Sequence, residues 1–190
     1  VERSKMGERK EMIFSINIPE IKGSFRKLCK SIGQKNITEF SYRTDKTQEA
    51  KILLGLEFSK GEEEKKSFVK SMKNKKYKIT DLSDDEISKV HLRYMSGGRA
   101  PEFLDGNVEE VFKVDFPERP GALMQFLELL KDKWNITLFH YKNQGSIYGG
   151  ALVGFSLKPS QLENLNKDLL KTEYPFLRVS DNAGYKAFLK

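Results

Sequence analysis

Hydrophobic positions alternate with polar ones near the start of the chain and then change to a helical spacing. Within residues 12–18, Met, Phe and Ile alternate with the outward-facing Ile13, Ser15 and Asn17, which predicts a strand with one buried face. Pro19 should end that strand, because proline cannot continue a hydrogen-bonded ladder. Apolar residues then recur at intervals of three and four, which predicts a helix with one apolar face over Phe25, Leu28, Cys29 and Ile32. Gly33 suits the position just after the end of such a helix.

The same pattern occurs twice in the chain. Pro19 and Gly23 match Pro117 and Gly121 at an offset of 98, and Tyr42 matches Tyr141 at an offset of 99. Strands are expected at 12–18, 37–43, 50–58 and 78–82 in the first copy, and at 108–116, 136–142, 151–157 and 176–179 in the second. Helices are expected at 25–32 and 62–74 in the first copy, and at 123–130 and 161–171 in the second.

Each copy therefore has the order βαββαβ, which predicts an α+β fold of antiparallel sheets with helices packed on one face. We expect a tail at 1–9, a first domain at 10–82, a connector at 83–106 and a second domain at 107–190. In the connector, Ser83 and Glu86 form a capping-box pattern that predicts the start of a short helix. Gly97 and Gly98 should end that helix, and Pro101 should prevent its restarting.

The composition is that of an ordinary globular protein, with 38% hydrophobic and 32% charged residues among 190. No apolar run approaches the roughly 20 residues of a membrane helix, and the first residues do not resemble a secretory signal. The chain begins with Val1, as a fragment or a processed product would. Cys29 is the single cysteine, which favours a reducing compartment and a buried side chain over a reactive thiol.

All of the net charge of +7 lies in the first half of the chain. Residues 1–95 contain 22 basic and 15 acidic residues, whereas residues 96–190 contain 12 of each. Much of the excess falls between Lys60 and Lys78, where Glu62, Glu63 and Glu64 are interleaved with it. A solvated helix face explains this better than a nucleic-acid surface does.

The residues of both copies resemble the regulatory region of biosynthetic threonine dehydratases. FPERPGALMQFLELLKDKWNITLFHYKNQGSIYGGALVGFSL, at 116–157, is similar to the second ACT-like domain of that family. IPEIKGSFRKLCKSIGQKNITEFSYR resembles the first, and LSDDEISKVHLRYMSGGR resembles the connector between them. The resemblance covers about residues 10–190 and implies two tandem ACT-like domains.

The resemblance also implies a role. In this family isoleucine binds the regulatory region and inhibits the enzyme, valine opposes it, and the enzyme is a homo-oligomer, a tetramer. A pyridoxal-phosphate catalytic domain with a Schiff-base lysine precedes the region. Neither that lysine nor a phosphate loop is expected here, so this chain should hold no cofactor and should not deaminate threonine alone. The expected location is the cytoplasm, or a mitochondrion or plastid in a eukaryote.

An amino-acid effector needs donors for its carboxylate and an apolar pocket for its side chain. Gly121 and Gly23 expose backbone N–H groups at helix N-termini, where anions are favoured, although a tight turn alone would also need glycine. The resemblance favours the ligand role. It implies that Tyr42 and Tyr141 match the tyrosines of the family's two effector sites. It also implies that Leu123, Leu127 and Leu130 match positions that influence isoleucine feedback. Periodicity alone assigns these leucines to the core.

Two further basic residues are candidate contacts for a carboxylate. Arg99 follows the glycine pair of the connector and could hold a carboxylate, or could be a solvated linker residue. Lys142 stands where the family often has arginine, and lysine cannot form a bidentate pair.

Other classes of function find less support in the sequence. His91 and His140 are too few and too far apart for a metal site, and no phosphate loop or nucleophile-elbow motif occurs. An RNA-binding RRM shares the βαββαβ order, but AKILLGLEF and GALVGFSL place aliphatic residues where an RRM needs stacking aromatics, so no nucleic-acid partner is expected. A stand-alone ACT sensor that acts on another enzyme remains an alternative.

Overall fold

The computed structural model describes residues 11–44, 49–87, 98–103, 105–117, 119–143 and 148–190. The first copy comprises β1 (Glu11–Pro19), α2 (Ser24–Ile32), β2 (Asn36–Arg43), β3 (Glu49–Glu57), α3 (Glu62–Asn74) and β4 (Lys78–Asp81). The second comprises β5 (Val108–Pro117), α5 (Ala122–Leu130), β6 (Asn135–Lys142), β7 (Tyr148–Leu157), α6 (Leu162–Leu170) and β8 (Phe176–Arg178). The predicted βαββαβ order is confirmed in both copies.

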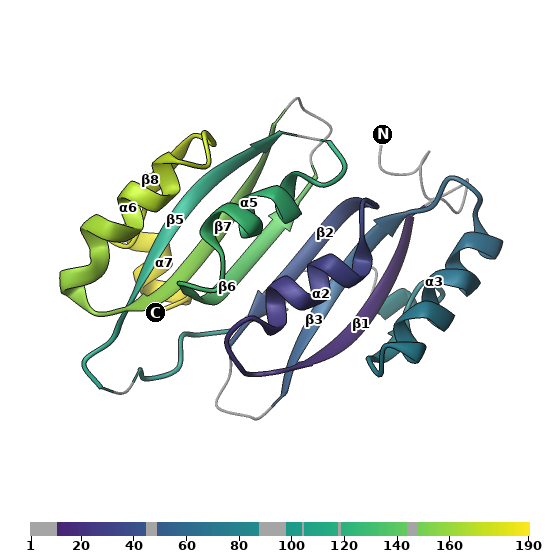
Figure 1. Ribbon diagram of the computed structural model, residues 1–190. Coiled ribbons are helices and arrows are strands. Elements are labelled where there is room, and N and C mark those ends of the chain that lie inside the picture. The colour runs from purple at the N-terminus through teal and green to yellow at the C-terminus, as the bar shows by residue number, and fades with distance from the viewer. Residues whose placement is uncertain (1–10, 45–48, 88–97, 104, 118, 144–147) are drawn as a thin grey trace.

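The two copies share one continuous sheet, where the sequence predicted separate sheets. The strand order is β4-β1-β3-β2-β6-β7-β5-β8, and every pairing between neighbours is antiparallel (Figure 1). β2 and β6 join the copies, with Phe40 opposite Tyr141 and Tyr42 opposite Phe139. Each of these strands would otherwise be an exposed edge with unpaired N–H and C=O groups, so the pairing satisfies both.

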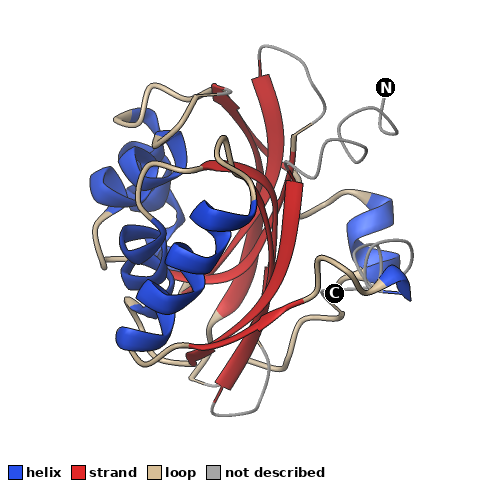
Figure 2. Cartoon of the chain, turned by 90° about the vertical axis from the view of Figure 1, so that its right-hand side faces the viewer, coloured by secondary structure: helices blue, strands red, loops and turns tan. Residues whose placement is uncertain are grey.

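The four helices of the two repeats, α2, α3, α5 and α6, cover one face of this sheet (Figure 2). α2 and α5 lie side by side above the β2–β6 seam (Figure 1). Below them, aromatic rings from both copies pack together: Phe25 lies 5.1 Å from Phe40 and 5.2 Å from Phe139, between ring centroids. Each fully buried phenylalanine contributes about 1.5–3 kcal/mol, so this cluster holds the copies together.

The opposite face of the sheet carries α7 (Ala183–Phe188), a short helix that the sequence pattern did not predict (Figure 2). Its N-cap is Asn182, whose side chain accepts hydrogen bonds from the N–H groups of Gly184 and Tyr185. Tyr185 packs against Val111 and Leu138 of the sheet. This face of the sheet is therefore partly apolar, and α7 covers its apolar patch.

A buried ion pair links this helix to both copies. Arg43 of β2 donates to both carboxylate oxygens of Glu109 on β5, at 2.7 and 3.0 Å, with the two side chains only 3% and 4% exposed. The hydroxyl of Tyr185 donates to Glu109 at 2.6 Å, and Arg43 also donates to the carbonyl of Leu189 at 2.8 Å. The C-terminal residues Tyr185 and Leu189 therefore contact side chains of both copies.

Some boundaries differ from the predictions. The predicted helix at 161–171 begins as a 3-10 turn, η2 (Pro159–Gln161), before α6.

The capping role predicted for Ser83 is wrong: its hydroxyl accepts from the N–H of Ile13 at 3.2 Å, so it ties the connector to β1. Asp85 accepts from the N–H of Ile87 instead, at the point where helical residues begin. Gly97 lies outside the described residues. Among the described helices, none is long and apolar enough to cross a membrane.

Candidate functional site

Two clefts lie at the seam between the copies, and each combines residues from both. The Gly121 cleft joins the turn before α5, together with Tyr141, to the end of α2 and the start of β2. The Gly23 cleft joins the matching turn before α2, together with Tyr42, to the end of α5 and the start of β6. The internal repeat therefore produces two sites of related construction, and each is incomplete without the other copy.

The turn of the Gly121 cleft presents the N-terminus of a helix. Gly121 has a φ of 84° and a ψ of −6°, a left-handed conformation that L-residues rarely adopt. The first turn of α5 contains no acidic residue, and no side chain caps it. Its first N–H groups and the helix dipole therefore favour an anion from outside the helix.

The floor of the Gly121 cleft is apolar. Cys29 and Ile37 come from the first copy, and Phe116, Phe139 and Leu123 come from the second. Cys29 is 3% exposed, and burial raises the pKa of its thiol, so it is a buried apolar residue as the sequence predicted. An aliphatic side chain would replace water favourably at this floor.

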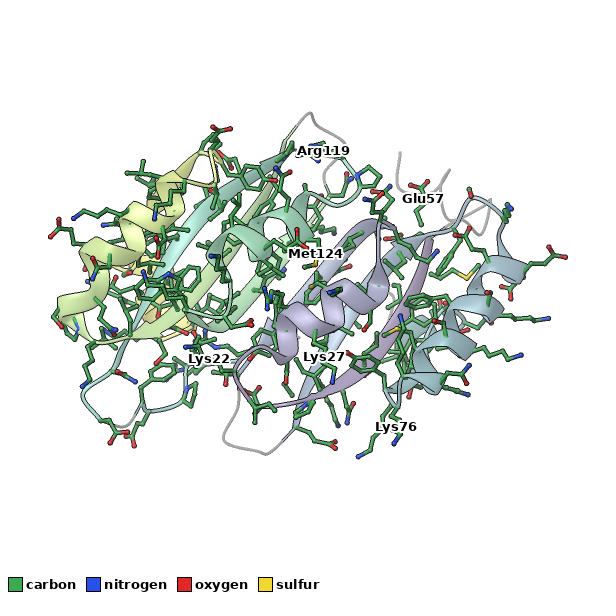
Figure 3. The ribbon with its side chains drawn as sticks, in the orientation of Figure 1. Lys22, Lys27, Glu57, Lys76, Arg119 and Met124 are labelled. Carbon is green, nitrogen blue, oxygen red and sulfur yellow. The ribbon has the colours of Figure 1, made fainter. Side chains whose placement is uncertain are left out.

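Polar groups lie at the rim of the same cleft. Tyr141 packs edge-on against Phe116, with ring centroids 6.4 Å apart, and its ring crosses the backbone of Gly149. Arg119 precedes α5 and donates to the side-chain oxygen of Gln125 (Figure 3). Lys35 also lines the cleft, but its ammonium is held by Glu64 of α3 at 2.7 Å. Arg119 is therefore the cation better placed to face an anion here.

The Gly23 cleft has the same turn but different side chains. Gly23 has a φ of 90° and caps α2. The hydroxyl of Tyr42 hydrogen-bonds to Glu20 at 3.4 Å and to the carbonyl of Ile136 at 3.3 Å. Burial, with the nearby Glu20 carboxylate, raises the pKa of Tyr42, so this hydroxyl stays protonated. Asp132 lies over Gly23 and is paired with Arg26 at 2.5 Å.

Both clefts are narrow in this structure. The remaining space is about 40 Å³ in the Gly121 cleft and about 30 Å³ in the Gly23 cleft. One water needs roughly 10–15 Å³ of such space, so a larger molecule enters only when lining side chains move. Met124 lies between α5 and α2 at the Gly121 cleft (Figure 3). Its unbranched side chain adjusts more easily than a ring does.

The structure brings most of the predicted site residues to these clefts. Leu123 lines the Gly121 cleft and Leu127 lines the Gly23 cleft. Leu130 is 3% exposed and belongs to the core, as periodicity alone predicts. Arg99 lies away from both clefts, where it donates to the carbonyl of Ala187 on α7 at 3.4 Å. Lys142 follows Tyr141 on β6, so its side chain points to the other face of the sheet.

The sequence pattern did not predict the residues that each copy contributes to the other's cleft. Cys29 and Ile37 line the cleft of Gly121, and Trp134 and Ile136 line that of Gly23. The only signal for them was the repeat itself, because two copies of a fold with exposed sheet edges tend to pair.

The basic charge of the first copy gathers in a groove that adjoins the Gly23 cleft. This groove of about 720 Å³ shares Gly23, Arg26 and Asp132 with the cleft. Its lysines are Lys22, Lys27 and Lys76, which Figure 3 labels, together with Lys30, Lys75 and Lys78. Lys78 is paired with Glu49 at 2.7 Å, and the lysines of α3 are exposed except Lys65. Six lysines therefore line one open groove at the surface.

Comparison with known proteins gives a consistent result. The family described as the C-terminal regulatory domain of threonine dehydratase matches residues 2–92 and 103–189. The chain is 44% identical over 188 residues to the biosynthetic L-threonine dehydratase IlvA of Escherichia coli, and 41% identical over 188 residues to that of Burkholderia multivorans. Each alignment covers 99% of this chain and 36% of the relative. The mitochondrial threonine dehydratase of Saccharomyces cerevisiae is 35% identical, over 100% of this chain and 34% of its own length.

Among solved structures, the acetolactate synthase small subunit of Thermotoga maritima aligns over 89% of this chain and 92% of its own, with 14% identity and a TM-score of 0.33. The coverage of the curated threonine dehydratases shows that this chain spans about a third of their length.

Proposed function

The chain belongs to the family of C-terminal regulatory domains of threonine dehydratase, and from this premise we propose that it binds a branched-chain amino acid in the Gly121 cleft. Isoleucine is the proposed inhibitory effector, and valine is its proposed antagonist. The proposed target is a threonine dehydratase catalytic domain that converts threonine to 2-oxobutanoate and ammonia.

The observation that carries this proposal is the juxtaposition of an uncapped helix N-terminus with an apolar floor. The N–H groups at the start of α5 would receive the carboxylate of the amino acid. Ile37, Phe116 and Phe139 would contact an aliphatic side chain. The hydroxyl of Tyr141 at the rim offers an acceptor for the ammonium group. Three different chemical groups of one small molecule would thus meet matching surfaces.

The narrowness of the cleft supports a regulatory role. A ligand that enters must displace side chains between α2 and α5, which come from different copies. Binding would therefore shift the packing at the seam, and a shift in packing can bias a neighbouring domain between two states. In the proposed assembly the chain acts within a homo-oligomer, a tetramer in the family.

Pyridoxal phosphate, which the family implies for the catalytic domain, does not fit the Gly121 cleft. Lys35, the lysine that lines the Gly121 cleft, is paired with Glu64 at 2.7 Å and packs over the rings of Phe58 and Phe68. A Schiff base needs a lysine amine that is free to react. We place the cofactor outside this chain and assign the chain no step of the reaction.

The alternative of a stand-alone sensor uses the same cleft and differs only in the partner. The proposed compartment is the cytoplasm of a bacterium or an organelle of a eukaryote, since relatives are named as mitochondrial and chloroplastic.

Calorimetry and thermal unfolding test the proposal. Isoleucine at 100 times its dissociation constant should stabilise the folded chain by about 2.7 kcal/mol per site. For a chain of this size the unfolding midpoint should rise by about 5–10 °C. Tyr141→Phe removes one hydroxyl at the rim and should reduce this rise, relative to the variant's own ligand-free midpoint. The absence of both heat and a shift with millimolar isoleucine and valine would refute binding by this chain.

A further inference from the structure

The lysine groove of the first copy has no basic counterpart in the second copy. It lies between α2 and the turn that joins α3 to β4, and six lysines line it. Each lysine has a matching position in the second copy, because Ile79 pairs with Ile16 as Phe176 pairs with Val114. The counterparts of Lys22, Lys27, Lys30, Lys75, Lys76 and Lys78 are Pro120, Gln125, Glu128, Thr172, Glu173 and Pro175. The shared fold therefore does not require these lysines.

Most of these lysines carry a charge that the protein itself does not neutralise. Lys78 is paired with Glu49 at 2.7 Å, and Lys75 donates to the carbonyl of Ser31 at 3.0 Å. The other four are exposed, and no described residue forms an ion pair or hydrogen bond with their ammonium groups: Lys22, Lys27, Lys30 and Lys76. Of the acidic residues described along the groove, Glu128 alone has no such partner. The groove therefore has an excess of free positive charge.

The turn after α3 holds Lys76 in a conformation that suits glycine better. Its φ is 66°, in the left-handed region where glycine usually ends a helix. The N–H of Lys76 donates to the carbonyl of Lys73 at 2.9 Å, and that of Tyr77 donates to the carbonyl of Met72 at 3.1 Å. These two bonds fix the turn, so the backbone from which the Lys76 side chain extends is also fixed. Figure 3 shows Lys76 at the end of α3, and Lys22 and Lys27 on the α2 side of the groove.

Lysines in this arrangement favour an anion with more than one charged group. A lysine ammonium is a compact cation with three donors, and it binds phosphate as a point charge. Ammonium groups in one groove repel one another over the Debye length of about 10 Å, and a multivalent anion relieves that repulsion. Because the lysines come from two walls, an anion must carry several charges to contact both.

The size of the groove limits the ligand to a small molecule. Its volume of about 720 Å³ lies within the range of roughly 300–1,000 Å³ that is usual for small-molecule sites. Glu49, Glu128 and Asp132 also line it, so a long phosphate backbone would meet negative charge as well. A short ligand can contact the lysines alone.

We propose that this groove binds a small ligand with two or more phosphate groups, of the size of a nucleoside triphosphate. Lys27 and Lys30 of α2 hold it from one wall, and Lys76 holds it from the other. The proposal does not depend on amino-acid binding, and the site is distinct from the Gly121 cleft. α2 is common to both, since Cys29 lines that cleft and Lys27 lines the groove.

Calorimetry and thermal unfolding of the whole chain with inorganic tripolyphosphate test the proposal. We expect one equivalent to bind and the unfolding midpoint to rise, because the ligand binds the folded chain. Inorganic monophosphate should bind at least about tenfold more weakly, since it contacts fewer lysines at once. High salt should weaken the binding of tripolyphosphate, because it screens exposed charges.

A pair of double variants separates the groove from the overall charge. Lys27→Gln/Lys76→Glu introduces the residues of the second copy and removes three positive charges, so at about fivefold per charge the affinity for tripolyphosphate should fall roughly 100-fold. Lys66→Gln/Lys70→Glu is the matched control, since it removes the same charge from exposed residues of α3 that do not line the groove. Its affinity should change by less than about threefold, because charges farther away are screened. Both variants should fold, because all four side chains are exposed, and ligand-free unfolding would check this.

Each outcome bears directly on the groove. Loss of binding in the groove variant, with binding retained by the control, supports the proposal. If millimolar tripolyphosphate at low salt gives neither heat nor a shift with the wild-type chain, the proposal is overturned. If both double variants lose affinity equally, binding follows net charge and the groove is not a site. If a single-stranded RNA oligonucleotide binds the groove more tightly than tripolyphosphate at physiological salt, the groove is a nucleic-acid surface and the proposal again fails. None of these results alters the test with isoleucine.

Discussion

Two adjacent glycines on β7 offer a direct test of where Tyr141 lies. A Cβ atom on Gly149 would lie 2.5 Å from Cε2 and 2.9 Å from the hydroxyl oxygen of Tyr141, closer than real Cβ contacts come. On Gly150 it would meet only Lys113 and Asp115, at 3.6 and 3.8 Å, which are ordinary contacts. Gly149→Ala should therefore displace the Tyr141 ring, and Gly150→Ala should displace nothing.

The size of the effect follows from two terms. Replacing glycine by alanine stabilises a protein by about 0.4–1 kcal/mol through the unfolded chain, and this term is common to both variants. Overpacking costs about 1–3 kcal/mol and applies to Gly149→Ala alone. The free energies of unfolding should therefore differ by about 1–3 kcal/mol, with Gly150→Ala equal to or more stable than the wild type. At about 2–4 °C per kcal/mol, the midpoints should differ by roughly 2–12 °C.

Thermal unfolding followed by circular dichroism would measure this difference, and calorimetry would measure isoleucine affinity in the same samples. We expect weaker binding by Gly149→Ala, because the displaced ring alters the rim of the Gly121 cleft, and unchanged binding by Gly150→Ala. If the two variants are equally stable, the Tyr141 ring does not lie across Gly149. If Gly149→Ala is destabilised and yet binds isoleucine as the wild type does, Tyr141 is not part of the effector site.

Three further predictions concern the buried or partly buried groups Glu109, Asp168 and Cys29. Glu109→Gln leaves the buried guanidinium of Arg43 poorly compensated and should cost about 3–5 kcal/mol in denaturant unfolding; a loss below 1 kcal/mol would contradict the role given to this pair. Hydrogen bonds, chiefly from Lys133, lower the pKa of Asp168 to about 2, below its unfolded value, so its contribution is present above about pH 4 and is lost as the pH falls towards 2. Asp168→Asn should therefore destabilise the chain by about 1–2 kcal/mol at pH 7 and by little near pH 2, whereas an equal loss at both values would exclude an ionic cause. Burial raises the pKa of the Cys29 thiol, so a disulfide reagent should react with the folded chain at least about 100-fold more slowly than with the urea-unfolded chain, and equal rates would show that the thiol is exposed.

Local patterns in the sequence were sufficient to predict each copy of the fold. The spacing of Phe25, Leu28 and Ile32 reflects burial on one face of α2, which the structure confirms. The alternation in β1 is confirmed at residues 14–18, whereas Ile13, predicted to face outward, is only 3% exposed. The pairs Gly23 with Gly121 and Tyr42 with Tyr141 occupy the same local structure, since each glycine caps a first helix and each tyrosine lies on a strand at the seam.

The pairing of the copies could not be read from local patterns. The register of β2 against β6 depends on rings that lie about 100 positions apart, such as Phe40 and Phe139 at 5.7 Å. α7 was missed because it has six residues, and a single buried side chain, Tyr185, fixes it. The residues that each copy contributes to the other's cleft were missed because they also depend on how the copies pair. Asp132, for example, is a neighbour of Gly23 only in the folded chain.

Joining the two copies in one chain has an evolutionary consequence. When identical chains pair across a two-fold axis, every substitution appears in both binding sites, so the sites remain alike. Here β2 and β6 form the same kind of antiparallel seam, but both copies lie in one chain, so each half can mutate independently. Gln34 and Asp132 illustrate that freedom, because the side chain beside Gly121 is uncharged and the side chain beside Gly23 is acidic. A symmetric dimer of single-copy chains could not carry different side chains at its two matching turns.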